Sequence, residues 1–395
     1  MLFRATFSVA LLALVLNIGE IFNLERANAI EKSLLLLAAF TLLLRGRIAW
    51  SVVTCVVFVL LSTLISAVFT VYSGFAWDIY FRSLASLAAA LLFLVVIPSR
   101  SDSEFILLTF VFLPVFEIAV SALYQIRFGI SMFRVDGLLG DMRLAGTTHP
   151  AFLAPLAVAG AFAAVFLADL KNKLYLVMTV VNGIILLLTA ARMPALVFTL
   201  CCGSALIFCF QGQHSMRLFI LLTGPIAASI VGLIFSERIM ARLEYGSLSG
   251  REVLWNYLRN VSDHYPAFGI GLGHQSTIMG HETMVLNPTI AAHNEYIRLL
   301  VEVGWIGSAL MIFAGVALFT AIWSSRWISY NPIFLVSVIA FAIYSYTDNT
   351  LSRFEANAIL IVALIGCATV HQFRKIGIAH QTPSRLQGVG RLAKR

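Results

Sequence analysis

The chain is poor in charged residues. Only 12% of its 395 residues are charged and 60% are hydrophobic, whereas a soluble globular domain carries about 25% charged residues. This balance excludes a soluble enzyme and a disordered chain, because neither class presents so much apolar surface to water. It predicts a polytopic membrane protein whose residues 1–395 form one integral membrane domain.

Metal-binding and acyl-transfer motifs are also missing. The five cysteines lie in apolar runs without metal-ligand spacing, so we expect them to pack as small apolar side chains. No His, Cys, Asp and Glu cluster has zinc spacing, and neither Asp-x-Asp nor G-x-S-x-G occurs. The sequence therefore predicts no metal and no cofactor.

Hydrophobic runs that could cross a membrane recur along the whole chain. A spanning helix needs roughly 20 mostly apolar residues, and about twelve runs approach that length. The predicted fold is all-α, with runs at 5–23, 33–44, 48–71, 79–98, 105–124, 150–168, 174–190, 194–210, 218–235, 300–323, 331–347 and 356–371.

The distribution of basic residues predicts the orientation. The tail at 372–395 is basic and lacks acids, so the positive-inside rule predicts that it is cytoplasmic. Counting back through the runs places the N-terminus, Arg45, Arg47 and Lys171 on the same side. The opposite, periplasmic side then receives the long loop 236–299, in which we expect short helices.

Arginine dominates the basic residues that this topology assigns to the periplasmic side, and Lys32 is the exception. Arginine binds phosphate and carboxylate through two parallel hydrogen bonds, which suggests recognition of an anionic ligand. The alternative is that these arginines pair with loop acids such as Asp136 and Glu244.

Two of these arginines stand where helices are predicted to begin. Arg192, in Ala190-Ala191-Arg192, lies between two runs with almost no loop, where an arginine is costly unless it meets water or an anion. Its alternative role is to extend to the interface. Arg251, in Ser249-Gly250-Arg251, lies in a helical first turn whose free N–H groups would favour an anion, or it faces solvent.

A histidine motif lies where the long loop meets a hydrophobic run. His293-Asn294-Glu295-Tyr296 is followed by Glu302-x-Gly304-x-x-Gly307. Helical spacing predicts one face for His293 and Ile297 and another for Asn294 and Arg298. A histidine at a membrane surface is a candidate general base at neutral pH, and a structural role is the alternative. His149, before Pro150, begins another run in a similar position.

Three glycines, Gly269, Gly271 and Gly273, resemble a phosphate-binding loop only superficially. No βαβ unit precedes them and no Lys-Ser/Thr pair follows. They predict a tight turn.

Together these motifs resemble the bacterial O-antigen ligase and polysaccharide polymerase family. The resemblance rests on Ala190-Ala191-Arg192, Ser249-Gly250-Arg251, the glycine run, the His293 motif and a looser segment from Arg143 to Pro150. It covers residues 140–310. The chain departs from the family at Ala190-Ala191, where many members have a serine.

The resemblance implies a GT-C-like membrane glycosyltransferase of the bacterial inner membrane that acts in O-antigen or exopolysaccharide synthesis. Such an enzyme moves a glycan from undecaprenyl diphosphate to a hydroxyl at the periplasmic face, without a metal and with inversion at the anomeric carbon. The acceptor is lipid A-core for a ligase, or the end sugar of another lipid-linked repeat unit for a polymerase. Nucleic acid is not an expected partner.

Residue roles follow from the same resemblance. By position, His293 is the base, and Arg192 and Arg251 bind the diphosphate. Arg143, His149, Asn294 and Arg298 are further candidates for contact with the substrate.

Two choices remain open at this point. A twelve-span transporter for an anionic substrate is the rival to the enzyme. It would predict two similar halves and polar residues at mid-membrane, whereas only the second half of this chain holds a long loop. Between polymerase and ligase the sequence slightly favours polymerisation, since nothing in it specifies a lipid A-core acceptor.

Overall fold

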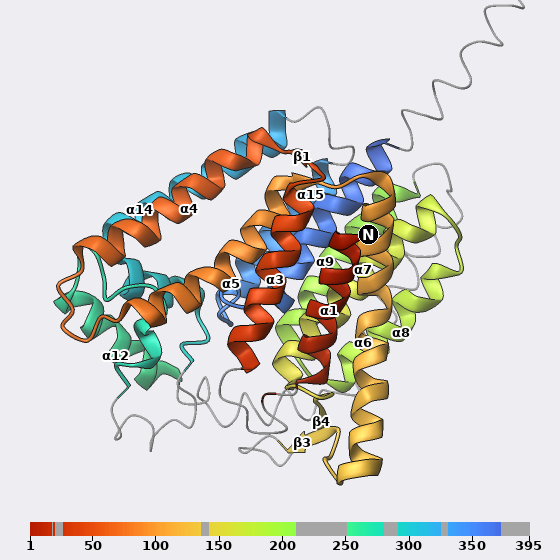
Figure 1. Cartoon of the computed structure of the whole chain (residues 1–395), viewed down its shortest axis with the longest axis horizontal. Coiled ribbons are helices and arrows are strands. Elements are labelled where there is room, and N and C mark those ends of the chain that lie inside the picture. Colours follow the sequence, from red (N-terminus) through yellow and green to blue (C-terminus); the bar gives the residue numbers. More distant parts are fainter. Residues whose placement is uncertain are drawn as a thin grey trace, which may run out of the picture.

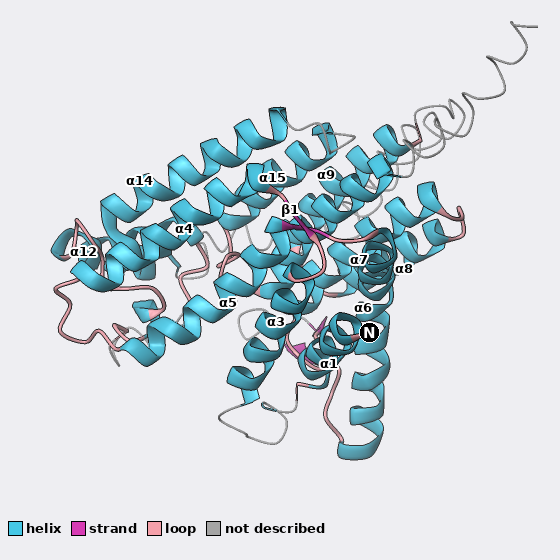
Figure 2. Ribbon diagram, turned by 45° about the horizontal axis from the view of Figure 1, so that its top comes forward, coloured by secondary structure: helices cyan, strands magenta, loops and turns pink. Residues whose placement is uncertain are grey.

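The protein is a bundle of helices of unequal length (Figures 1 and 2). The structure, a computed structural model, describes residues 1–17, 19, 27–135, 142–210, 251–279, 291–324 and 331–372. The all-α prediction is confirmed apart from two short strand pairs. The predicted run 218–235, most of the basic tail and residues 236–250 and 280–290 of the predicted loop lie outside the described residues.

The helices follow the hydrophobic runs closely. They are α1 (Leu2–Leu16), α3 (Ala27–Leu43), α4 (Trp50–Phe69), α5 (Trp77–Val95), α6 (Arg100–Phe128), α7 (Pro150–Leu170), α8 (Tyr175–Leu188), α9 (Arg192–Cys209), α12 (Arg251–His264), η1 (His274–Ser276), α14 (Glu295–Ser324), α15 (Asn331–Ser345) and a last helix, Phe354–Gln372. Strand β1 (Arg47–Ile48) pairs with β2 (Val96–Ile97), and β3 (Phe133–Val135) pairs with β4 (Met142–Leu144), both antiparallel.

Seven of the described helices are long and apolar enough to cross a membrane. They lie in α4, α5, α6, α7, α9, α14 and the last helix. Helices α1, α8 and α15 are apolar but shorter. Helix α1 ends at Leu16, where Asn17 adopts the left-handed conformation, and residues 18 and 20–23 of the predicted run 5–23 lie outside the described residues.

Small residues allow two central helices to pack closely. Helix α7 and the last helix are each 89% buried, and α7 contacts α6, α8 and α9. A Cβ on Gly160 would meet the Phe110 carbonyl oxygen at 2.8 Å, and one on Gly366 would overlap the Phe166 ring. Close approach through glycine and alanine is typical of helix packing in membranes. The predicted packing role of the cysteines is confirmed for Cys201, Cys202, Cys209 and Cys367, which are buried in the apolar core.

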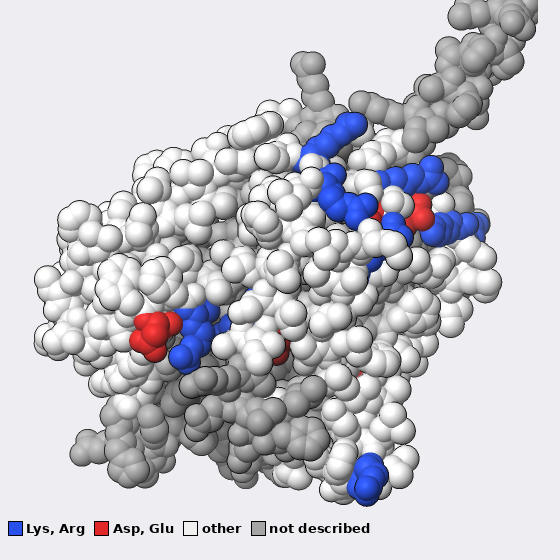
Figure 3. All heavy atoms as spheres, viewed as in Figure 1, with Lys and Arg blue, Asp and Glu red and all other residues white. Residues whose placement is uncertain are grey.

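Basic residues gather at one end of the bundle, near β1 and the N-terminus (Figure 3). Arg4 and Arg45 lie 3.0 and 3.8 Å from the buried carboxylate of Asp102, and Lys171 lies 2.7 Å from Glu104. This end therefore holds the N-terminus, Arg45 and Lys171, which the positive-inside rule placed on the same side of the membrane. Helices α7 and α9 begin at the other end, where the candidate functional residues lie.

Helix α14 lies along α4 and is broken at Gly304 (Figure 1). Gly304 has φ 65° and ψ −171°, so α14 is not one continuous helix. The run predicted at 300–323 also begins earlier than expected, at Glu295. The break leaves carbonyl groups of α14 without their helical hydrogen bonds, and a neighbouring segment supplies new donors to them. Ile270 N–H and Gly271 N–H donate to the carbonyls of Val301 and Glu302 at 3.0 and 2.8 Å.

The three glycines make the predicted tight turn that fits into this break. Gly269, Gly271 and Gly273 all have positive φ, which favours glycine. A Cβ on Gly269 would also lie 2.5 Å from the Val301 carbonyl oxygen. From α4, Ser66 Oγ donates to the Glu302 carbonyl at 2.7 Å. The turn and α4 therefore fix the start of α14 together.

Candidate functional site

His293 lies directly before α14 and beside a buried carboxylate. Asn294 Oδ1 accepts from Ile297 N–H at 3.1 Å and caps the helix. His293 precedes this cap with φ 46°, so the predicted helical face shared with Ile297 is wrong. Its Nδ1 lies 3.5 Å from Asp348 Oδ1, and its side chain is 20% exposed. The ring therefore has one nitrogen toward a carboxylate while part of it remains accessible.

Asp348 lies in the turn between α15 and the last helix and is well supplied with hydrogen-bond donors. Arg353 Nη1 donates to it at 3.1 Å, the Tyr344 hydroxyl at 3.2 Å and Asn349 N–H at 2.8 Å. Burial tends to raise the pKa of Asp348, but the contact with His293 and the charge of Arg353 outweigh burial and hold that pKa below its usual value. An ionised Asp348 favours the His293 tautomer with its proton on Nδ1, which leaves Nε2 as an acceptor.

Arg353 connects this pair to the start of α7. Its guanidinium lies 4.6 Å from the centre of the Phe152 ring, a cation–π distance. His149 contacts the same ring edge-on, and its Nδ1 accepts from Ala151 N–H at 3.2 Å, which caps α7. The His149 side chain is exposed at this end of the bundle.

Arg251 approaches the same turn from α12. Its Nη1 donates to the Thr347 carbonyl at 3.5 Å, one residue before Asp348. Trp255 Nε1 donates to the Ala292 carbonyl at 2.8 Å, one residue before His293. The structure thus brings Arg251 and His293 to neighbouring residues, Thr347 and Asp348, of the turn that follows α15.

Arg143 and Arg192 share a second turn at the same end. Arg192 is the exposed first residue of α9, and Ala190 before it has φ 53°. Arg143, on β4, donates from Nε to the Thr189 carbonyl at 2.8 Å. Arg143 therefore fixes the turn from which Arg192 projects.

The level of Arg192 follows from the packing of α9 against α15. Short connections join α7 to α8 and α8 to α9, so α9 runs parallel to α7. A short turn also joins α15 to the last helix, so these two helices are antiparallel. The last helix runs parallel to α7, since Arg353 contacts Phe152 and Gly366 contacts Phe166. Midway, Cys201 contacts Ser337. Equal helical rise from there places Arg192 level with the end of α15, the helix that leads into the Asp348 turn.

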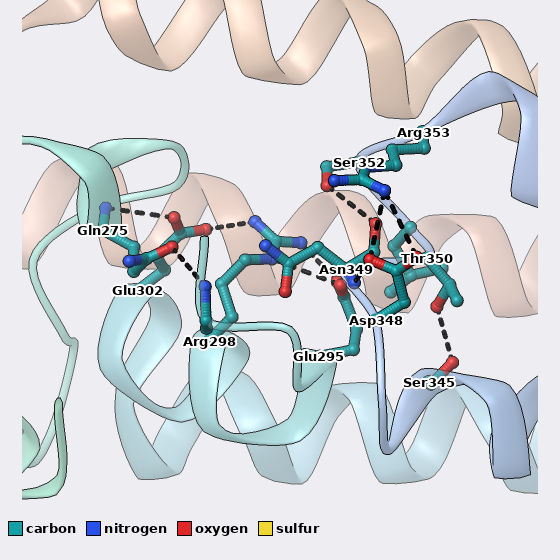
Figure 4. Close-up of polar contacts among 12 residues, drawn as sticks. Gln275, Glu295, Arg298, Glu302, Ser345, Asp348, Asn349, Thr350, Ser352 and Arg353 are labelled. Carbon is teal, nitrogen blue, oxygen red and sulfur yellow. Dashed lines mark hydrogen bonds and ion pairs between the residues drawn. The ribbon is translucent and has the colours of Figure 1, made fainter. Parts of the chain in front are cut away.

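Arg298 is enclosed by carboxylates (Figure 4). It is 5% exposed, donates from Nη2 and Nε to Glu295, and donates from Nη1 to Glu302. Glu302 also accepts from Gln275 N–H at 3.2 Å. With all three side chains ionised, this triad carries a net charge of −1, so Arg298 is already neutralised.

Sequence reasoning missed Asp348 and Arg353. Both follow a predicted run, but nothing in their spacing indicates a partner 55 positions earlier in the chain (348 minus 293). The carboxylates around Arg298 had a signal, because positions three and four residues away share a helix face. Within the described residues, no three His, Cys, Asp or Glu side chains lie together in a way that could hold a metal ion.

Part of the chain is similar to a known protein family. The family model described as O-antigen ligase matches residues 174–312, which include Arg192, Arg251 and His293 but not Asp348. No curated protein matches the chain. The match confirms the resemblance that the motifs indicate, over residues 174–312.

Proposed function

We propose that the protein is a bacterial inner-membrane glycosyltransferase that moves a glycan from undecaprenyl diphosphate to a hydroxyl acceptor at the periplasmic face. The family match supports a role in ligating or polymerising glycans at a membrane. The observation that carries the proposal is the His293–Asp348 pair. It stands beside Arg251, at the end of the bundle where α9 presents Arg192.

His293 is the proposed general base. Nε2 takes the proton of the acceptor hydroxyl as that oxygen attacks the anomeric carbon of the donor sugar. The bond from this carbon to the diphosphate oxygen breaks, and lipid diphosphate leaves with the electron pair, so the configuration inverts. A positioned base contributes roughly 10²–10⁴-fold to such a reaction, and Asp348 stabilises the imidazolium that forms.

Arg192 and Arg251 are the proposed diphosphate ligands. Guanidinium groups bind phosphate oxygens bidentately and stabilise the charge that develops on the leaving group. Arg192 is the first residue of α9, where free N–H groups add to the anion site. Arg143 acts on Arg192 through the Thr189 carbonyl and so serves as a positioning residue.

The remaining candidates have roles at the margins of the site. Asn294 and Arg298 shape the start of α14 through the cap and the triad, and in this proposal they place His293 rather than bind phosphate. His149 is exposed at the start of α7 and is the proposed contact for a distant part of the glycan.

Deletion of the gene in its host, with complementation, tests the proposal. Wild type should restore the surface glycan on a gel and His293→Ala should not. Arg251→Ala should also fail, whereas Arg259→Ala, an exposed arginine on the same helix, should succeed. Loss of polymer on lipid A-core with lipid-linked polymer accumulating identifies a ligase, and single repeat units identify a polymerase. Full complementation by His293→Ala would contradict the proposal.

A further inference from the structure

A cavity of about 240 Å³ lies beside the His293–Asp348 pair. Residues of α3, α5, η1, α14 and the turn after Asp348 line it. Six hydroxyl and amide side chains line it, namely Ser83, Ser86, Gln275, Ser276, Asn349 and Ser352, together with the charged side chains of Lys32, Arg298 and Glu302. This set belongs to neither the proposed base nor the proposed diphosphate ligands.

Two polar atoms of this lining have no hydrogen-bond partner within the part of the chain that the structure describes. They are Ser86 Oγ and Asn349 Oδ1, and Asn349 is only 7% exposed. An unpaired buried polar atom costs free energy, so such atoms in a cavity indicate a ligand that supplies the missing partners. Asn349 Oδ1 requires a donor, and Ser86 Oγ can donate or accept.

The charges and shape of the cavity favour a neutral polyhydroxyl ligand. Arg298 lines it but is neutralised by Glu295 and Glu302, which give this triad a net charge of −1 when all three side chains are ionised. Lys32 also lines the cavity, and its positive charge balances that of the triad, so the charged groups around the cavity sum to zero. Three leucines, Leu87, Leu272 and Leu351, form an apolar part of the wall. A sugar ring has hydroxyl groups at its edge and apolar C–H faces, and it matches both parts of this lining.

We propose that this cavity binds one sugar ring of the acceptor glycan, an inference that rests on the proposed function. Asn349, which directly follows Asp348, lines it, and so does Ala291, two residues before His293. Asn349 N–H donates to Asp348 at 2.8 Å, and Figure 4 shows the two residues side by side, so one residue both lines the cavity and supports the proposed base. Arg192 and Arg251 do not line it, so donor diphosphate and acceptor sugar occupy separate subsites.

Direct binding to the full-length protein in lipid nanodiscs tests the assignment independently of transfer. The probes are methyl glycosides of glucose, galactose, rhamnose, N-acetylglucosamine and N-acetylgalactosamine at millimolar concentration, detected by saturation-transfer NMR. At least one should bind the wild type. Asn349→Ala and Ser86→Ala should each weaken binding about five- to tenfold. Ser204→Ala, a buried serine in α9, should leave it unchanged.

Two further arms separate the outcomes. Excess inorganic pyrophosphate should not displace the glycoside, and His293→Ala should retain glycoside binding. The inference is overturned when no glycoside binds the wild type, when both cavity variants bind as tightly as the control, or when pyrophosphate displaces the sugar. Because these experiments measure glycoside binding and not glycosyl transfer, they test the sugar site even if the proposed transfer reaction is wrong.

Discussion

Replacement of Asp348 by Asn tests how the site activates His293. The carboxylate lies 3.5 Å from Nδ1 and is 9% exposed. With an effective dielectric constant of about 20, full charges at that distance attract by roughly 5 kcal/mol. His293 is partly exposed, and solvent screening reduces this to about 3 kcal/mol. Since the imidazolium forms in the transition state, Asp348→Asn should lower kcat about a hundredfold.

The assay measures transfer by the purified protein from an undecaprenyl-diphosphate-linked oligosaccharide, with kcat and KM determined separately. Asp102→Asn is a matched control. It removes a carboxylate that is buried and paired with arginines to a similar degree, but at the opposite end of the bundle. The control should keep its kcat. A folded Asp348→Asn enzyme with more than half of the wild-type kcat would refute this role for Asp348.

Further predictions concern stability, measured by thermal unfolding in detergent. The pKa of Asp348 is lower in the folded protein, so its contribution is present above the unfolded pKa of about 3.9 and disappears as pH falls through the folded pKa. The stability difference between wild type and Asp348→Asn should therefore hold from pH 7 to about pH 4 and close below it; a constant gap at lower pH would count against the assignment. Arg298→Ala should cost about 3–5 kcal/mol, since it leaves two buried carboxylates without their cation, and a change below about 1 kcal/mol would show that the triad is not ionised. Gly269→Ala should cost at least about 2 kcal/mol because of its positive φ and the adjacent backbone. Gly203→Ala, in open space on α9, should be neutral or stabilising, and equal effects at the two glycines would contradict the tight fit of the turn.

Hydropathy predicted the helices well because each run must bury its backbone groups within itself in a membrane. The break in α14 was not predictable in this way. Gly304 leaves the helical conformation because a turn more than thirty residues earlier supplies the replacement hydrogen bonds. The glycines signalled a turn, but their spacing did not say which helix the turn would enter.

The candidate site was predictable only where its members are local in sequence. The motif around His293 marked the start of α14, but the partner Asp348 reaches it through tertiary packing alone. Arg298 was considered as a ligand for an anion, yet Glu295 and Glu302 at helical spacing already neutralise it. Arg251 was expected in the first turn of a helix, and it is the first described residue of α12.

The most direct test of the central claim is glycan transfer by purified wild type and His293→Ala on the same lipid-linked donor. The account predicts product and released undecaprenyl diphosphate with wild type, with or without EDTA. It predicts a loss of at least about a hundredfold in kcat with His293→Ala, while donor binding is retained. Full transfer by His293→Ala, or inhibition by EDTA that a divalent ion reverses, would contradict it.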